Sequence, residues 1–313
     1  MESPRKISGT VLRFERSSIY DGDGLRTVLF LKGCPLRCLW CSTPESQKFE
    51  PERGMTHEKC TLCGRCVKAC PNGALSIEGG RIKTDQEKCA GRFECLRACP
   101  NGAITQYGVK MTAAEAVREI AKDELFFFHS GGGLTVSGGE PLSQPEFLKE
   151  VLAGCRERGI ECAIESSFCA PWEKIEPILP YISLLHADIK QIDPEKHKKL
   201  TGVGNAQILD NIKRADKSPY KFGIVIRTPL IPGINDADED LIKLAGYVSS
   251  LQKLRFMEFL AYHRLGTETY KRLEREYELD EIQPPEAQFM REKALLFKKA
   301  AGVTVKINGV TVE

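Results

Sequence analysis

Short apolar runs recur along the chain and alternate with longer segments in which polar and apolar residues mix. The runs are RTVLFLK before residue 50 and GLTVSG, ECAIES, SLLHADIK, FGIVIR and RFMEFLAY after residue 110. Each run has the length of a buried strand, and the segments between them have the mixture typical of amphipathic helices. Repeated strand and helix units of this kind predict an α/β protein with six parallel strands.

Six parallel strands joined by right-handed crossovers can form an open, partial (β/α)6 barrel resembling a TIM barrel. A flat, doubly wound sheet is the alternative. In a barrel the carboxyl ends of the strands meet at one mouth, where the binding site lies. Glu165 and Ser166 end one predicted strand, and Asp188 and Lys190 follow another. We therefore expect these four polar residues at one site.

Ten of the thirteen cysteines lie between Cys34 and Cys99. CTLCGRCVKACPNGAL and CAGRFECLRACPNGAI, at 60–75 and 89–104, are repeats of equal length. The first copy has the spacing of a bacterial ferredoxin, whose thiolates hold iron–sulfur cubanes. Zinc, which favours paired C-x-x-C units, and disulfides, which are unusual in a long chain without a signal peptide, are weaker alternatives. The sequence thus predicts a ferredoxin-like insert over residues 51–109, between barrel segments 1–50 and 110–313.

In this ferredoxin pattern the fourth cysteine of each copy binds the other cluster. The second cluster is then one thiolate short, because Arg92 stands where the first copy has Cys63. Either a residue elsewhere supplies the ligand, or an iron is left open or lost. Cys155, Cys162 and Cys169 are expected in the core, with that fourth ligand as their alternative role. The predicted ligands are Cys60, Cys63, Cys66 and Cys99 for one cluster and Cys70, Cys89 and Cys95 for the other.

The remaining cysteines, Cys34, Cys38 and Cys41, follow the first apolar run in GCPLRCLWC. Three thiolates on a cubane leave one iron without a protein ligand. Such an open position can bind a substrate or cofactor, as open positions on other catalytic metals do.

The CxxxCxxC spacing resembles that of radical S-adenosylmethionine (SAM) enzymes, and the flanking residues resemble the activating enzymes of glycyl radical enzymes. The resemblance extends over most of the chain, through SIYDGDGLRTVLFLKGCPLRCLWCSTPES, GGGLTVSGGEPLSQPEF, HADIKQIDPEKHKKLTG, RTPLIPGIND and LAYHRLG. It implies a partial barrel with a catalytic 4Fe-4S cluster and an insert with two auxiliary clusters. It also implies reductive cleavage of SAM to a 5′-deoxyadenosyl radical, which takes a hydrogen from a glycine of a partner lyase or dehydratase.

The resemblance assigns further residues to the cofactor. Gly138 and Gly139 would let the main chain approach it, and the acid of Glu140 would meet its ammonium group. Asp188 and Glu165 would hold a monovalent cation, with a structural ion pair between Asp188 and Lys190 as the alternative. Asp21 would position the target glycine, and His197 is expected at the surface. The implied cofactor-binding residues are Trp40, Gly138, Gly139, Glu140, Glu165, Ser166, Asp188, Lys190, Arg227 and His263.

The net charge of +2 offers no large field for nucleic acid or an anionic membrane. No segment reaches the roughly 18 apolar residues of a membrane span, and no signal peptide is recognisable, which indicates a cytoplasmic protein. We expect a monomer in anaerobic cytoplasm with a flavodoxin or ferredoxin as electron donor, and auxiliary clusters that relay electrons or dock a partner. A radical SAM enzyme acting on a small molecule and a ferredoxin-type electron carrier are the alternatives.

Overall fold

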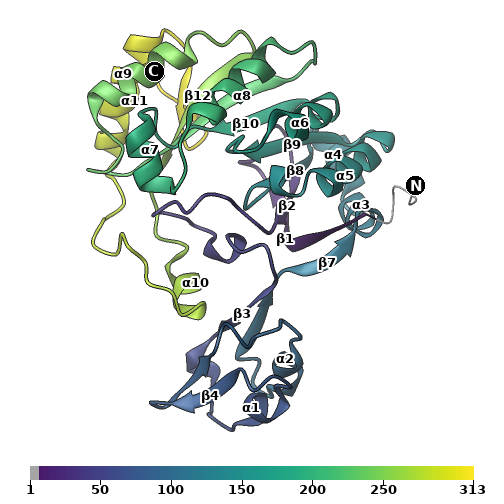
Figure 1. The fold of residues 1–313 in the computed structure, drawn as a ribbon. Helices are drawn as coiled ribbons and strands as arrows, with labels where there is room; N and C mark the ends of the chain where they lie inside the picture. The colour runs from purple at the N-terminus through teal and green to yellow at the C-terminus, as the bar shows by residue number, and fades with distance from the viewer. Residues whose placement is uncertain (1–6) are drawn as a thin grey trace.

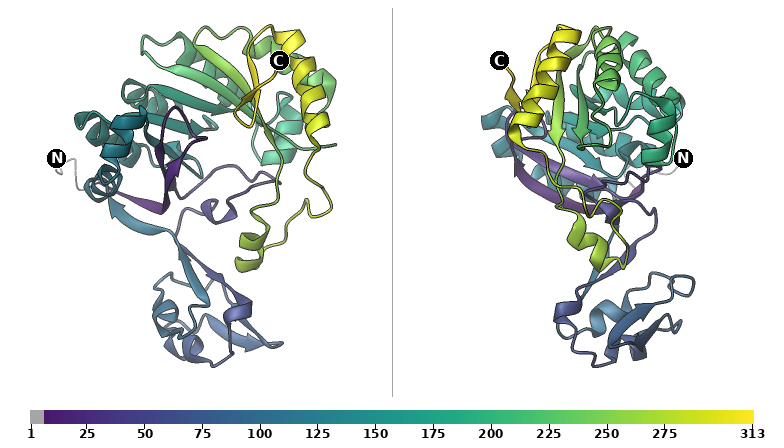
Figure 2. Two further views of the ribbon diagram at one scale, coloured as in Figure 1. Left: turned by 180° about the vertical axis from the view of Figure 1, so that it is seen from behind. Right: turned by 90° about the vertical axis from the view of Figure 1, so that its left-hand side faces the viewer.

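The computed structural model describes residues 7–313. Residues 1–6, on which the expectation about a signal peptide partly rests, lie outside the described residues. A large body built on one sheet carries a small lobe that projects from it in every view (Figures 1 and 2). No helix within residues 7–313 combines the length and the apolar character that a membrane span needs.

The sheet of the large body has ten strands. All six predicted runs form neighbouring parallel strands, and the short strand β13 adds a seventh. Antiparallel strands flank them, β1 and β7 at one edge and β14 at the other. The strands are β1 (Ser8–Ser18), β2 (Arg26–Leu31), β7 (Val109–Thr112), β8 (Gly133–Gly138), β9 (Glu161–Ser166), β10 (Leu184–Asp188), β11 (Gly223–Leu230), β12 (Leu254–Ala261), β13 (Val305–Ile307) and β14 (Val310–Thr311).

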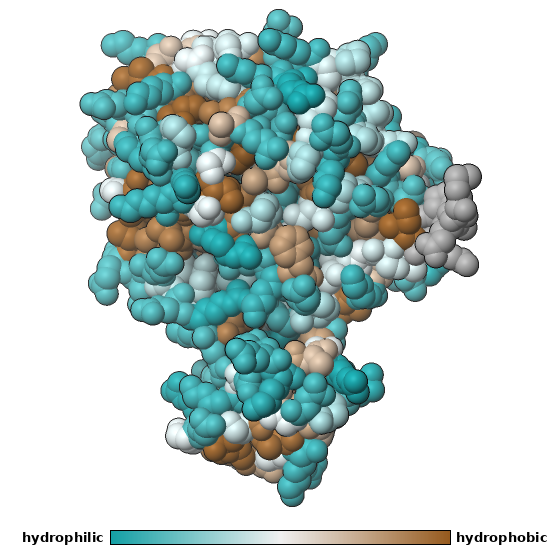
Figure 3. Space-filling model, viewed as in Figure 1, coloured by the Kyte–Doolittle hydropathy of each residue, from teal (hydrophilic) through white to brown (hydrophobic). Residues whose placement is uncertain are grey.

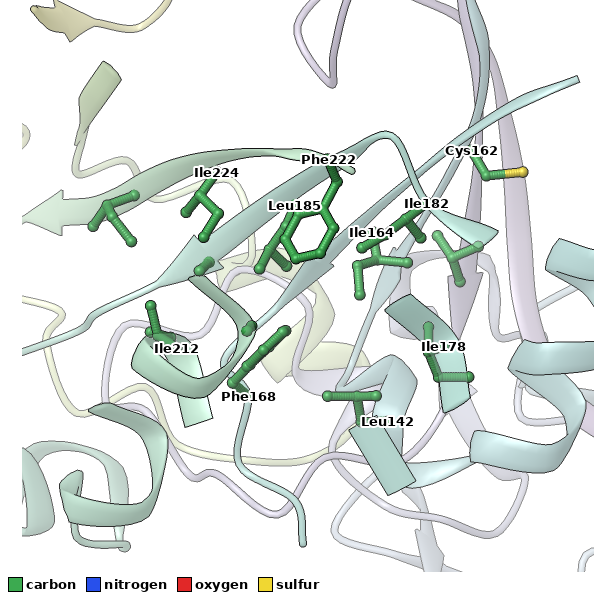
Figure 4. Packing of buried hydrophobic residues seen from close by; sticks show 14 of the residues in the cluster. Leu142, Cys162, Ile164, Phe168, Ile178, Ile182, Leu185, Ile212, Phe222 and Ile224 are labelled. Atoms are coloured by element: carbon green, nitrogen blue, oxygen red, sulfur yellow. The ribbon is translucent and has the colours of Figure 1, made fainter. Parts of the chain in front are cut away.

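The parallel strands follow chain order, from β2 through β8 to β13, without a reversal. A doubly wound sheet reverses its order at a switch point, so that alternative is wrong. The long helices pack on one face of the sheet and form a single core with it. Ile164, Leu185 and Ile224, from three adjacent strands, point to the side of the sheet on which Ile212 and Ile178 of the covering segments lie (Figure 4). The helices are α3 (Ala113–Ala121), α4 (Glu124–Ser130), α5 (Pro145–Glu157), α6 (Trp172–Ile175), α7 (Pro194–Thr201), α8 (Ala206–Lys217), α9 (Asp238–Val248), α10 (Thr267–Arg272) and α11 (Ala287–Ala301).

Alternation along the strands directs polar residues to the other face. On β9, Cys162 and Ile164 lie in the helix-covered core. Successive strand side chains point to opposite faces, so Glu165 points away from that core. By the same alternation Asp188, at the end of β10, and Arg227, on β11, lie on the face away from the helices, hereafter the inner face. The two residues are paired in register on adjacent strands. The sheet thus gathers these groups at its carboxyl edge.

The small lobe contains two two-stranded sheets and a pair of short helices. The helices α1 and α2 occupy matching places in the two cysteine repeats and pack against each other. Because β7 begins at Val109 and pairs in the main sheet, the last strand of the lobe is β6. The lobe elements are β3 (Glu52–Met55), α1 (Arg65–Ala69), β4 (Leu75–Glu78), β5 (Arg81–Thr84), α2 (Glu94–Ala98) and β6 (Ile104–Tyr107).

One carboxylate at the junction ties the lobe to the large body. Glu52 accepts a 2.8 Å hydrogen bond from the fully buried Lys32 and a 2.5 Å bond from Arg275. Hydrophilic side chains dominate the surface around this junction (Figure 3). The two cations come from distant parts of the sequence, so this cluster fixes the lobe against the body.

The three remaining cysteines lie in the large body. Cys155 on α5 and Cys162 on β9 are fully buried in its core, and Cys169 packs against that core. The expected core role of these cysteines is what the structure shows. None of them lines a hollow of the small lobe.

Candidate active site

A cavity of about 290 Å³ opens at the carboxyl ends of the parallel strands. Its walls bring together residues from the loop after β2 and from the ends of β8 to β12. Of the predicted catalytic and cofactor-binding residues, only Asp21 and Glu140 are missing from this lining. The predicted residues that line it are Cys34, Cys38, Trp40, Cys41, Gly138, Gly139, Glu165, Ser166, Asp188, Lys190, Arg227 and His263.

The loop with the three cysteines is anchored to the end of α7. The backbone N–H groups of Arg37 and Leu39 donate to the carbonyls of Thr201 and Leu200, at 2.7 and 3.1 Å. Burial raises the pKa of the Cys38 thiol to about 12. Binding of metal therefore has to release protons from these thiols.

The chemistry of the three thiols fits an iron–sulfur cluster. They line a common cavity, and cysteine thiolates are the usual ligands of such clusters. A cubane keeps its cysteines apart because each binds a different iron, whereas tetrahedral zinc draws its ligands to one point. The residues present therefore suit a 4Fe-4S cluster.

Two glycines let the loop after β8 lie against the end of β2. Gly138 has a φ of +114°, and a Cβ atom there would lie 2.4 Å from backbone atoms of Leu31. A Cβ atom at Gly139 would lie 2.4 Å from the Gly33 carbonyl oxygen. The glycines were expected to admit a cofactor, but the structure also requires them for this backbone contact.

Glu140 differs from the sequence prediction, because its carboxylate does not line the cavity. It is fully buried and accepts hydrogen bonds from the hydroxyl groups of Ser166 and Ser167, at 2.6 and 2.5 Å, and from the backbone N–H groups of Leu142 and Ser167. Burial raises its pKa, and these donors oppose the rise. Glu140 therefore connects the loop after β8 to the end of β9. Ser167 was missed from the sequence, where only its place beside Ser166 suggested a role.

Arg227 lies in a network of buried charges on the inner face. Its Nε donates to Glu258 Oε2 at 2.8 Å, its Nη1 to Glu165, and its Nη2 to the Tyr20 carbonyl at 2.9 Å. Burial raises the pKa of Glu165, and Arg227 opposes that rise. Ser137 Oγ donates to the other oxygen of Glu165 at 2.6 Å. Sequence reasoning missed Glu258, although a lone acid within the apolar run RFMEFLAY is a signal for it.

Asp188 and Lys190 form the ion pair that was weighed as the alternative. Lys190 Nζ donates to Asp188 Oδ2 at 2.8 Å. Burial alone would lower the pKa of Lys190, but the Asp188 carboxylate together with the Cys38 and Cys34 sulfurs outweighs burial, and the pKa is raised. Both acids expected to hold a monovalent cation thus have a cationic partner, Lys190 for Asp188 and Arg227 for Glu165.

Asp21 and His197 lie outside the cavity lining. The Asp21 carboxylate accepts from Ser18 Oγ, and its carbonyl accepts from Thr135 Oγ1 at 2.7 Å. Its charge contributes to the raised pKa of Glu165, after the larger effect of burial, which places it near the inner network. The expected surface position of His197 is wrong. It is buried on α7, with Nδ1 2.7 Å from the Val203 carbonyl oxygen.

The lobe has two small hollows, and each is lined by one predicted ligand set. Cys60, Cys63, Cys66 and Cys99 line the first, hereafter hollow 1. Cys70, Cys89 and Cys95 line the second, hereafter hollow 2. The predicted exchange of the fourth cysteine between the two repeats therefore agrees with the way the thiols are grouped in the structure. The lining of hollow 2 contains Arg92 and Glu94 but no fourth cysteine.

Arg53 on β3 also lines hollow 2. Its Nη2 donates to Thr84 Oγ1, while its buried Nε and Nη1 atoms have no hydrogen-bond partner. Burial raises the pKa of Cys95, and the Arg53 guanidinium partly offsets the rise. No motif in the sequence singled this arginine out.

Comparison with known proteins agrees with this geometry. The Radical SAM superfamily profile matches residues 93–245, and a 4Fe-4S dicluster domain profile matches residues 59–103. A radical SAM methyltransferase from Sphaerobacter thermophilus superposes with a TM-score of 0.54 at 11% identity, covering 96% of this chain and 76% of that chain. That likeness shows a mixed α/β radical SAM fold.

Similarity to curated proteins extends over nearly the whole chain, including the cysteine loop before the superfamily match. The (2S)-3-sulfopropanediol sulfolyase activating enzyme of Bilophila wadsworthia is 43% identical, over 94% of this chain and 98% of its own. The isethionate sulfite-lyase activating enzyme of Oleidesulfovibrio alaskensis is 40% identical, over 89% and 91%. This goes against the alternative of an electron carrier alone. The chain belongs to the activating enzymes of glycyl radical enzymes, within the radical SAM superfamily.

Proposed function

We propose that the cavity binds SAM beside a catalytic 4Fe-4S cluster held by Cys34, Cys38 and Cys41. The observation that carries this proposal is that three thiols, and no fourth cysteine, open into one cavity at the carboxyl edge of the sheet. When bound, the cluster supplies the electron that breaks a carbon–sulfur bond of SAM and yields the 5′-deoxyadenosyl radical. A partial (β/α)6 barrel, with the strand order described above, places the cavity at its mouth.

The chain's own residues bind and orient the cofactor. Lys190 and Arg227 line the cavity, and in the proposal their positive charges bind the carboxylate of SAM. The main chain at Gly138 and Gly139 also lines the cavity and would contact the methionine end of SAM. Trp40 and His263 line the wall where the adenosyl part would lie. The monovalent cation expected near Asp188 and Glu165 stays a prediction; in the structure these two acids pair with Lys190 and Arg227.

The protein substrate is a partner glycyl radical enzyme of the lyase or dehydratase class. The two relatives described above are named for a sulfolyase and a sulfite-lyase, which supports that class. Asp21 precedes β2 beside the Arg227 network, and in the proposal it positions the partner's glycine near the cavity. We also propose that the protein works as a monomer.

The small lobe, taken as a ferredoxin-like insert over residues 51–109, would hold two auxiliary clusters. Hollow 1 supplies four thiolates, and hollow 2 supplies three with Arg92 at the fourth position. Cys63 and Cys89 are exposed, so a flavodoxin or ferredoxin could approach either cluster. The proposed clusters need their cysteines as thiolates and not as disulfides, which supports a reducing, anaerobic cytoplasm as the place of work.

The test is transfer of the radical to a partner. Reduced, cluster-loaded protein is incubated with SAM and a candidate glycyl radical enzyme, and the partner is examined by electron paramagnetic resonance. We expect a glycyl radical signal that is absent from a partner whose target glycine is changed to alanine. SAM cleavage with a small-molecule product and no partner signal would favour the second candidate function.

A further inference from the structure

Arg53 is a buried cation whose hydrogen bonds are incomplete within the chain. Its side chain belongs to a residue that is only 9% exposed, and two of its three nitrogen atoms, Nε and Nη1, have no partner. Burying an unpaired charge and unsatisfied donors is strongly unfavourable. No carboxylate within residues 7–313 forms an ion pair with this guanidinium, whose charge acts on the thiols of Cys95 and Cys66, so a group bound beside those thiols can supply its counter-charge.

The position of Arg53 indicates where that counter-charge lies. It is part of the wall of hollow 2, with the thiols of Cys70, Cys89 and Cys95. The other charged side chains of this wall, Arg92 and Glu94, are exposed and half-buried, so Arg53 is the buried charge of the hollow. Thr84 Oγ1 accepts from Nη2 and fixes the plane of the guanidinium.

We propose that Arg53 is the internal cation of the second auxiliary cluster, donating hydrogen bonds from Nε and Nη1 to its sulfur atoms and stabilising its reduced state. This inference rests on the proposed function, in which the lobe holds clusters. Hydrogen bonds to the sulfurs and local charge are among the factors that set cluster potentials. A positive charge in a buried site is weakly screened, so it favours the state with the extra electron. The Arg53 charge also acts on Cys66 of hollow 1, but Arg53 does not line that hollow, so its cluster responds less.

The experiment measures the potentials of the auxiliary clusters alone. The full chain carries Cys34→Ala, Cys38→Ala and Cys41→Ala, is loaded with iron and sulfide, and is titrated anaerobically with spectroscopic detection. In this background Arg53→Gln removes the charge, and Arg53→Lys retains it without the planar fork. Arg81→Gln is the matched control, because Arg81 is exposed on β5 and lines neither hollow.

We expect Arg53→Gln to lower the equilibrium constant for reduction of one auxiliary cluster about tenfold, which is about 59 mV for one electron. Arg53→Lys should shift it less, and Arg81→Gln should match the parent. An Arg53→Gln protein that loads normally and keeps the parent potentials overturns the proposal.

If Arg53→Gln does not take up its clusters, a second measurement on a chain that retains Arg53 tests the proposal. In an Arg92→Gln chain grown with ¹⁵N-arginine, the reduced cluster should show ¹⁵N hyperfine coupling that disappears in Arg53→Lys. Absence of that coupling overturns the proposal. If the triple-alanine parent binds no iron in its lobe, the cluster assignment is wrong, which the iron content alone reveals.

Discussion

Arg227 and Glu258 face each other across adjacent strands, and Arg227 Nε donates a 2.8 Å hydrogen bond to Glu258 Oε2. Both side chains are buried, at 8% and 6% exposure. The pair holds the guanidinium at the cavity wall, where Glu165 and the Tyr20 carbonyl take its other donors. Glu258 thus acts on the site through Arg227.

Replacing Glu258 by leucine should destabilise the protein and weaken cofactor binding. Removing Glu258 costs about 2 kcal/mol, because the buried Arg227 loses one charged hydrogen-bond partner and keeps only Glu165. We expect that loss in the free energy of unfolding, together with a raised KM for SAM. The control Glu173→Leu changes an exposed acid on α6 and should alter stability by no more than about 0.5 kcal/mol. Unchanged stability and KM in Glu258→Leu would contradict this role.

His186 should make the stability fall in acid. Burial, and secondarily the charges of Arg227, Arg26 and Arg255, lower its pKa well below the ordinary 6.5. The unfolded chain then binds a proton below pH 6.5 that the folded chain does not. This stability is present above pH 6.5 and is lost as the pH falls toward the folded pKa. From pH 7 to pH 5 the parent should lose about 2 kcal/mol relative to His186→Leu.

Urea unfolding of the parent and of His186→Leu at both pH values measures this difference. A cavity left by leucine lowers the free energy of unfolding of His186→Leu equally at both pH values. It therefore cancels when the change from pH 7 to pH 5 is compared between the two proteins. A difference between the proteins that stays constant from pH 7 to pH 5 would show that His186 titrates alike in both states.

Arg92→Cys should complete the ligands of the second auxiliary site. Arg92 lies in the wall of hollow 2 with three thiols, so a cysteine there restores the pattern of the first repeat. We expect the iron content to rise by about one atom per chain, with a change in the spectrum of one auxiliary cluster. Arg97→Cys, on the exposed side of α2, is the control and should leave both unchanged. An Arg92→Cys protein with the parent iron content and spectrum would indicate that another group already binds that iron.

The sequence was sufficient for the features that depend on local pattern. The apolar runs predicted the six parallel strands, because buried parallel strands have continuous apolar stretches. The repeat spacing grouped the lobe cysteines as they meet in hollows 1 and 2. Strand β13 escaped prediction because three residues show no periodicity.

The features that were missed depend on tertiary pairing. Whether Glu140 faces the cavity or the two serines after β9 depends on how the loops pack. Arg53 looks like an ordinary lobe arginine until β3 buries it beside hollow 2. Lys32 and Arg275 meet at Glu52 only because the fold joins segments more than 200 residues apart.

The central claim is that Cys34, Cys38 and Cys41 hold a cluster with one iron open to SAM, and cofactor cleavage by the isolated enzyme tests it most directly. Reduced, cluster-loaded parent should convert SAM to 5′-deoxyadenosine and methionine, whereas Cys38→Ala, loaded in the same way, should form neither. Cys169→Ala, which changes a cysteine that lines neither the cavity nor a hollow of the lobe, should retain the activity. Cleavage that persists in Cys38→Ala at the parent rate would contradict the account.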